Sequence, residues 1–104
     1  MQDQFTQALL QQFPEGILLI KAGLLQQQDL MEAHEIAEAA NSSMDQVVVN
    51  SGFVTEKILR NAKTARQFIQ QDLMVESLAV DGLREAAKRN LDLEAALKYL
   101  GWGW

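Results

Sequence analysis

Few side chains in this 104-residue sequence could perform acid–base or metal chemistry. His34 is the single histidine, and Glu38 follows it at the i+4 spacing that brings two side chains together on a helix. The pair could act as a general base or contribute metal ligands. The alternative is a histidine at the edge of the core, partly packed and partly solvated. One imidazole and one carboxylate are too few for a zinc site, so we predict the structural role.

The same segment carries a row of acids at three-residue spacing, namely Asp29, Glu32, Glu35 and Glu38. Such a row could form a carboxylate cluster for catalysis or for Ca²⁺. Calcium sites take oxygen ligands from loops, however, and a solvated helix face is the simpler interpretation. The sequence also has no cysteine and no Gly-x-x-x-x-Gly-Lys-Ser/Thr phosphate loop. We therefore predict no catalytic residue, no metal site and no cofactor.

Basic residues are concentrated in a second segment. Four of the nine lie within ten positions, at Lys57, Arg60, Lys63 and Arg66. They are candidate binding residues for an anionic or acidic partner, and the alternative is an ordinary exposed face. Residues 1–50 contain seven acids and one base, whereas residues 51–104 contain seven acids and eight bases. The halves could therefore pair within the domain, or head-to-tail in a homo-oligomer.

Both tryptophans, Trp102 and Trp104, lie in the closing Gly-Trp-Gly-Trp. Tryptophan is enriched among the residues that dominate protein interfaces, so both are candidate partner-binding residues. The alternative is that Trp102 folds back over the open end of the core, which we favour for Trp102.

We expect these residues to lie on helices, because the residue pattern that repeats along the chain is typical of helices. A glycine followed by two apolar residues, then an apolar residue and an alanine, starts at Gly23 and again at Gly52, with a period of 29 residues. A degenerate copy starts at Asp72, and Gly101 stands where another would begin. A period of this length indicates one supersecondary unit stacked several times. We predict an all-α fold, a compact array of alternating short and long helices built from about three αα repeats.

We predict a single domain over residues 1–104, with an N-terminal helix in 1–13 and repeat units over 16–40, 44–71 and 73–100. Gly23, Gly52 and Gly101 are the predicted structural turns, because glycine readily adopts the left-handed conformation that closes a helix. Three consecutive valines at 47–49 could form a strand, but their place in the repeat favours a helix. The predicted N-caps are Thr55, Ser77 and Asp92.

The apolar residues of each long helix should form one buried stripe. In the helix over 27–40 we expect Leu30, Ala33, Ile36, Ala37 and Ala40 to face inward. In the next long helix we expect this of Ile58, Ala62, Ala65 and Ile69, and in the last helix of Leu93, Ala96, Leu97 and Leu100.

The repeated glycine, two apolar residues, cap and helix of the form x-x-x-Leu-x-x-Ala resemble the N-terminal domains of assembly ATPases in bacterial type II secretion and type IV pilus systems. The resemblance covers residues 16–66 well and 67–101 loosely. It implies a helical regulatory domain. Part of that family binds cyclic di-GMP through an Arg-Leu-Gly element seven residues before the repeat glycine and through a glutamine late in the long helix.

These ligand-binding elements are largely replaced in this chain. The Arg-Leu-Gly positions read Pro14-Glu15-Gly16 and Ser43-Met44-Asp45, and the late glutamine is replaced by Ile36 and Ala65. Loss of arginine removes the planar fork that binds a guanine dinucleotide, and the acids repel its phosphates. Cyclic di-GMP sensing is therefore the alternative function, and a non-enzymatic protein–protein interaction or regulatory adaptor module is the predicted one.

Composition agrees with a single globular domain, because 48% of residues are hydrophobic and 22% are charged. The net charge of −5 disfavours nucleic-acid binding, which depends on neutralising phosphates. No apolar run approaches the roughly 20 residues that span a bilayer, and the first residues lack the pattern of a signal peptide. We therefore expect a cytoplasmic protein with a protein partner.

Overall fold

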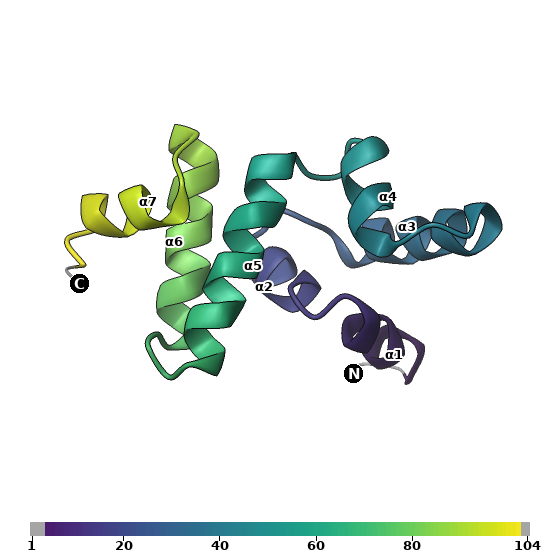
Figure 1. The fold of residues 1–104 in the computed structure, drawn as a ribbon, viewed down its shortest axis with the longest axis horizontal. Coiled ribbons are helices and arrows are strands. Elements are labelled where there is room, and N and C mark those ends of the chain that lie inside the picture. The colour runs from purple at the N-terminus through teal and green to yellow at the C-terminus, as the bar shows by residue number, and fades with distance from the viewer. Residues whose placement is uncertain (1–3, 103–104) are drawn as a thin grey trace.

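The computed structural model describes residues 4–102, with side chains from residue 7 onward, and this part of the chain forms seven helices and no strand. The all-α prediction is confirmed, and the three valines lie in a helix. The strict alternation of short and long helices ends where two long helices follow each other (Figure 1). The helices are α1 (Gln4–Gln12), α2 (Gly16–Lys21), α3 (Gln27–Ala40), α4 (Met44–Asn50), α5 (Glu56–Gln70), α6 (Glu76–Arg89) and α7 (Leu93–Tyr99).

The second half of the described chain repeats the plan of the first half, 49 residues later. Helices α3 and α6 both have 14 residues, α4 and α7 both have seven, and each pair starts at positions 49 apart. Asn41 and Asn90, also 49 apart, end α3 and α6 in the left-handed conformation, with φ of 54° and 56°. The structure thus does not confirm three units of 29 residues. It consists of two larger halves, residues 4–52 and 53–101.

The halves differ most clearly at Pro14. In the second half α5 is continuous, whereas the matching segment of the first half is divided into α1 and α2. Pro14 stands 49 residues before Lys63 and lacks the amide hydrogen that a helix interior requires. After this break α1 packs against α3, whereas α2 packs against α5 and α6 (Figure 1). Because of this break, α2 can pack against the second half, and it thereby connects the two halves.

The predicted glycine turns are confirmed. Gly23, Gly52 and Gly101 have φ of 76°, 80° and 87°. Asp72, which replaces glycine in the degenerate copy, keeps the same left-handed conformation with φ of 59°. Its amide donates to the Ile69 carbonyl, as the Gly52 amide donates to the Val49 carbonyl, so the turn persists without the glycine.

Of the predicted N-caps, Thr55 is confirmed, because its hydroxyl accepts from the Ile58 amide at 3.1 Å. Asp92 holds the N-cap position of α7, although its side chain makes no cap hydrogen bond. The prediction for Ser77 is wrong. Helix α6 begins at Glu76 after an extended Val75, and Glu76 places a negative charge at the positive end of the helix dipole.

The buried stripes are narrower than predicted. On α3, Leu30, Ala33 and Ala37 are buried, but Ile36 and Ala40 are exposed, because α3 packs mainly against α1 and α4. Leu100 was also predicted to face inward, but it follows the last turn of α7 and is exposed. The core runs through both halves and includes Phe13, Leu19, Leu30, Val48, Ala62, Ala65, Ala79, Leu83, Leu93 and Leu97.

A buried amide holds the turn between α6 and α7 against α5. The Asn61 Nδ2 donates to the Leu91 carbonyl, and its Oδ1 accepts from the Leu93 amide, both at 3.0 Å. One turn earlier on α5, the Lys57 Nζ donates to the Asn90 carbonyl at 3.0 Å. Because α5 supplies both side chains, it fixes the position of α7.

Replacement of Asn61 with alanine should lower the free energy of unfolding by about 2–4 kcal/mol, because the Leu91 carbonyl and the Leu93 amide lose their partner. Urea denaturation followed by circular dichroism measures the change. Asn50→Ala is the matched control, since Asn50 is exposed at the end of α4 and should change stability by less than about 0.5 kcal/mol. Equal losses of stability in the two variants would contradict the structural role of the Asn61 side chain.

Candidate functional site

The four predicted basic residues of α5 do not form one binding surface. A three-residue step turns a helix by about 300°, so their side chains spiral halfway round it. Lys57 reaches the α6–α7 turn and Lys63 reaches α2 and α4. Arg60 and Arg66 line separate grooves and form no ion pair within residues 4–102. The structure separates these cations.

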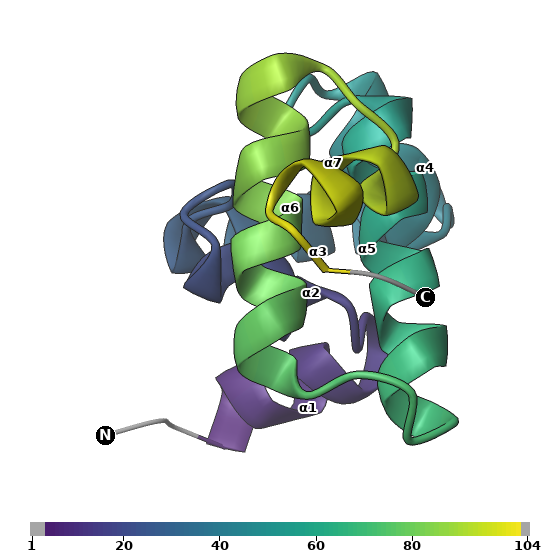
Figure 2. The ribbon, with the colours of Figure 1, turned by 90° about the vertical axis from the view of Figure 1, so that its left-hand side faces the viewer.

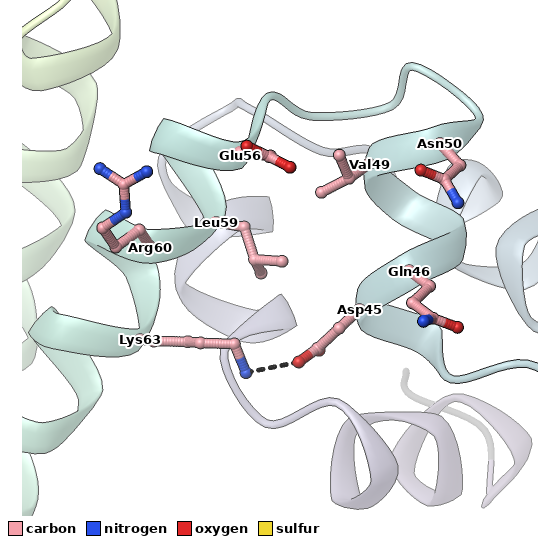
Figure 3. Close-up of a pocket in the computed structure, with 8 residues that line it drawn as sticks. All are labelled: Asp45, Gln46, Val49, Asn50, Glu56, Leu59, Arg60 and Lys63. Carbon is pink, nitrogen blue, oxygen red and sulfur yellow. Dashed lines mark ion pairs between the residues drawn. The ribbon is translucent and has the colours of Figure 1, made fainter.

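Lys63 is the centre of an ion cluster that joins three helices. Its Nζ lies 2.7 Å from Asp45 Oδ2, in the first turn of α4, and 3.1 Å from Glu15 Oε1, immediately before α2. Figure 3 shows Lys63 extending from α5 toward Asp45, with Arg60 pointing away from the pair. Glu15 is only 6% exposed, so it depends on this lysine for its counter-charge.

The electrostatics of the cluster are those of a structural contact. Burial of the ammonium lowers the pKa of Lys63, but its hydrogen bonds with Asp45 and Glu15 outweigh this, and the pKa lies above its ordinary value. Such a lysine stays protonated near neutral pH, which is the opposite of what a nucleophilic amine needs. Two carboxylates and one ammonium give the cluster a net charge of −1.

The groove beside this cluster, between α4 and α5, has a volume of about 380 Å³ (Figure 3). Val49 and Leu59 form its apolar part, and the amides of Gln46 and Asn50 lie on the α4 side. Glu15 and Asp45 also occupy positions of the resembled Arg-Leu-Gly elements. A phosphate group at these positions would therefore meet two carboxylates that already share one cation.

His34 lies at the edge of the core, as predicted for a structural histidine. Its side chain is 16% exposed, and Nε2 lies 3.5 Å from Glu38 Oε1. No group of three or more histidine, aspartate or glutamate side chains within residues 4–102 is arranged to hold a metal ion. Asp29 accepts from the Gln26 amide at 3.2 Å and so caps α3, whereas Glu32 and Glu35 are exposed.

The two halves pair in part as the charge pattern suggests, because Lys63 of the second half binds Glu15 and Asp45 of the first half. Within the described chain no ion pair links the acids of α3 to the bases of α5. Instead Lys21 Nζ of the acidic half lies 2.5 Å from Glu76 Oε1 of the other half. The Arg84 guanidinium donates to the Lys21 and Ala22 carbonyls at 3.3 and 3.4 Å, which caps the end of α2.

Exposed apolar side chains are concentrated on two segments, the α5–α6 turn and the end of α7, which both lie on the side of the molecule that faces the viewer in Figure 2. Among the described residues, six large apolar side chains are classed as exposed, and four lie on the α5–α6 turn or at the end of α7. We call these four the C-terminal apolar end. They are Leu73 (51% exposed), Val75 (66%), Tyr99 (58%) and Leu100 (44%).

Trp102 lies beside this apolar end, partly buried against the core as predicted for a covering residue. It lines a groove of about 310 Å³ together with Leu73, Val75 and Leu78. Arg89 stacks over Tyr99, with its guanidinium carbon 3.7 Å from the ring centroid. Trp104, the other predicted tryptophan, lies outside the described residues. Leu73 and Val75 were not among the predicted binding residues, although they lie in the apolar run after Asp72.

Comparisons with known proteins leave the chain without an identified family. No family model matches it, and neither the curated proteins nor the solved structures contain a match. In the described part of the chain no helix has the length and apolar character needed to cross a membrane.

Replacement of Lys63 with methionine should lower the free energy of unfolding by about 2 kcal/mol. Loss of one partner from a buried pair costs roughly 3–5 kcal/mol, and solvent at the half-exposed lysine reduces that cost. The second substitution Glu15→Gln removes the uncompensated carboxylate and should recover most of the loss. Chemical denaturation of the single and double variants tests this. A double variant as unstable as Lys63→Met would show that Glu15 is not the cause.

The same cluster predicts a pH dependence of stability. Because the folded-state pKa of Lys63 lies above its ordinary value of 10.5, the ammonium contributes fully below about pH 10.5. Its contribution is lost as the pH rises through the folded-state pKa. The stability difference between the wild type and Lys63→Met should be constant from about pH 7 to 9.5 and shrink above about pH 10.5. Denaturation at several pH values measures it, and a difference that grew at high pH would contradict the sign.

Proposed function

We propose that this chain is a non-enzymatic protein–protein interaction module that binds its partner through the C-terminal apolar end. The carrying observation is the concentration of Leu73, Val75, Tyr99 and Leu100 at one end of the molecule. Apolar side chains gathered on a surface mark interaction sites more often than scattered ones do. Trp102 adds a partly exposed aromatic ring, a residue type that contributes strongly to binding energy.

The surroundings of this end suit a preformed binding surface. Asn61 and Lys57 attach the start of α7 to α5, so α7 does not depend on the partner for its position. The Asp72 turn fixes the direction in which Leu73 leaves α5. A surface that is ordered before binding loses less conformational entropy on association.

A regulatory role beside a secretion or pilus assembly ATPase is the extension that the sequence resemblance suggests. Cyclic di-GMP sensing is less well supported, because Pro14 and Ser43 stand where the family pattern has arginine, and the adjacent Glu15–Lys63–Asp45 cluster has a net charge of −1. We therefore propose a protein, rather than a nucleotide, as the partner.

The double variant Leu73→Ser/Val75→Ser should lose the partner while it keeps its fold, because both side chains are largely exposed. The double variant Met31→Ser/Ile36→Ser is the matched control, since these residues on α3 are 37% and 38% exposed. Cross-linking in the host, followed by quantitative mass spectrometry of proteins recovered with each bait, measures binding. We expect a loss of roughly tenfold for the first variant alone.

Two results would contradict the proposal. Equal losses with both double variants would show that exposed apolar area in general, and not this end, holds the partner. Failure of the wild-type bait to enrich any protein over an unrelated bait would argue against an interaction module.

A further inference from the structure

A groove at the corner between α1 and α2, facing α5, has the lining of a ligand site. It has a volume of about 570 Å³, within the range of about 300–1,000 Å³ common for small-molecule sites. Figure 1 shows this corner on the side of α5 opposite to α7, so the groove is separate from the C-terminal apolar end. Its lining residues are Gln7, Leu10, Gln11, Pro14, Ile17 and Arg66.

The apolar part of the groove follows from the proline break. Leu10 of α1, Pro14 of the break and Ile17 of α2 all line the groove, so the corner between the two helices brings them together. All three are partly buried. The Pro14 ring also has no amide hydrogen, so this part of the corner offers carbon rather than a donor.

Arg66 supplies the charged part of the groove. Its side chain is partly buried, yet it forms no ion pair with the described residues. The acid nearest the groove lining in sequence is Glu15, and that carboxylate is bound to Lys63 at 3.1 Å. The guanidinium of arginine presents five donors in a fixed plane. Among the residues that the structure describes, no acid therefore competes with an external anion for this cation.

We propose that the groove binds a small amphipathic monocarboxylate. The carboxylate takes two parallel hydrogen bonds from the Arg66 guanidinium, and the apolar body lies on Leu10, Pro14 and Ile17. One guanidinium balances one negative charge, whereas a phosphate dianion would keep excess charge in a chain that is already at −5. The glutamine amides of Gln7 and Gln11 leave the rim polar on the α1 side.

Decanoate, kept below its micelle concentration, is a suitable probe of the full chain. In a titration followed by amide NMR spectra we expect a dissociation constant on the order of 1 mM, with the largest shifts at residues 10–17 and 66. Decanol has the same chain without the charge, and at the same concentration, kept below the solubility limit of decanol, it should cause much smaller shifts than decanoate. The neutral probe thus separates the apolar contact from the charged one.

The variant Arg66→Gln should weaken decanoate binding about tenfold and leave the shifts caused by decanol unchanged. Arg60→Gln is the matched control, because Arg60 lies on the same helix outside this groove and also forms no ion pair with residues of the described range. The amide spectrum of each variant confirms that it is folded. Shifts of equal size with decanoate and decanol would overturn the proposal, as would wild-type affinity for decanoate in Arg66→Gln or an equal loss in Arg60→Gln. Shifts confined to the C-terminal apolar end would also overturn it, without bearing on the proposed function.

Discussion

The missing amide hydrogen of Pro14 is the constraint on which the arrangement of the helices depends. It ends α1 and frees the following segment to become α2, which packs against the second half of the chain. The contact requires polar bonds at both ends of α2. Glu15 is held by Lys63 before the helix, and Arg84 caps the carbonyls of Lys21 and Ala22 after it. Because Pro14 lacks a backbone amide hydrogen, the helix is broken there and α2 can connect the two halves.

The contact between the two halves changes how the cluster of bases on α5 is interpreted. A cluster of bases on one helix suggests an external anion, but two of the four cations bind within the domain. Lys63 neutralises a buried carboxylate, and Lys57 holds a turn. The groups left for a partner are the C-terminal apolar end and the separate arginines Arg60 and Arg66. A ligand would therefore find a few contacts at each place and no large charged surface.

The features that the sequence predicted are those set by neighbouring residues. The turns at Gly23 and Gly52 and the cap at Thr55 depend on a few consecutive positions. The contacts that it missed join residues far apart in the chain, such as Asn61 to Leu91 and Glu15 to Lys63. The 49-residue relation escaped because few residues recur at that spacing, whereas the 29-residue pattern records the similar ends of the short helices α2 and α4. The burial pattern and the backbone conformation recur at a spacing of 49 residues, although most residue identities do not.

The correspondence between the halves also shows that the end of α5 is more polar than the matching α2. In the first half, α2 buries Leu18 and Ala22, and these positions correspond to Gln67 and Gln71 at the end of α5. Both glutamines are exposed, and Gln70 replaces the Lys21 that pairs with Glu76. A third half stacked in the same way would have to bury amides with no partner. The polar end of α5 therefore lacks the apolar residues with which α2 packs against the second half.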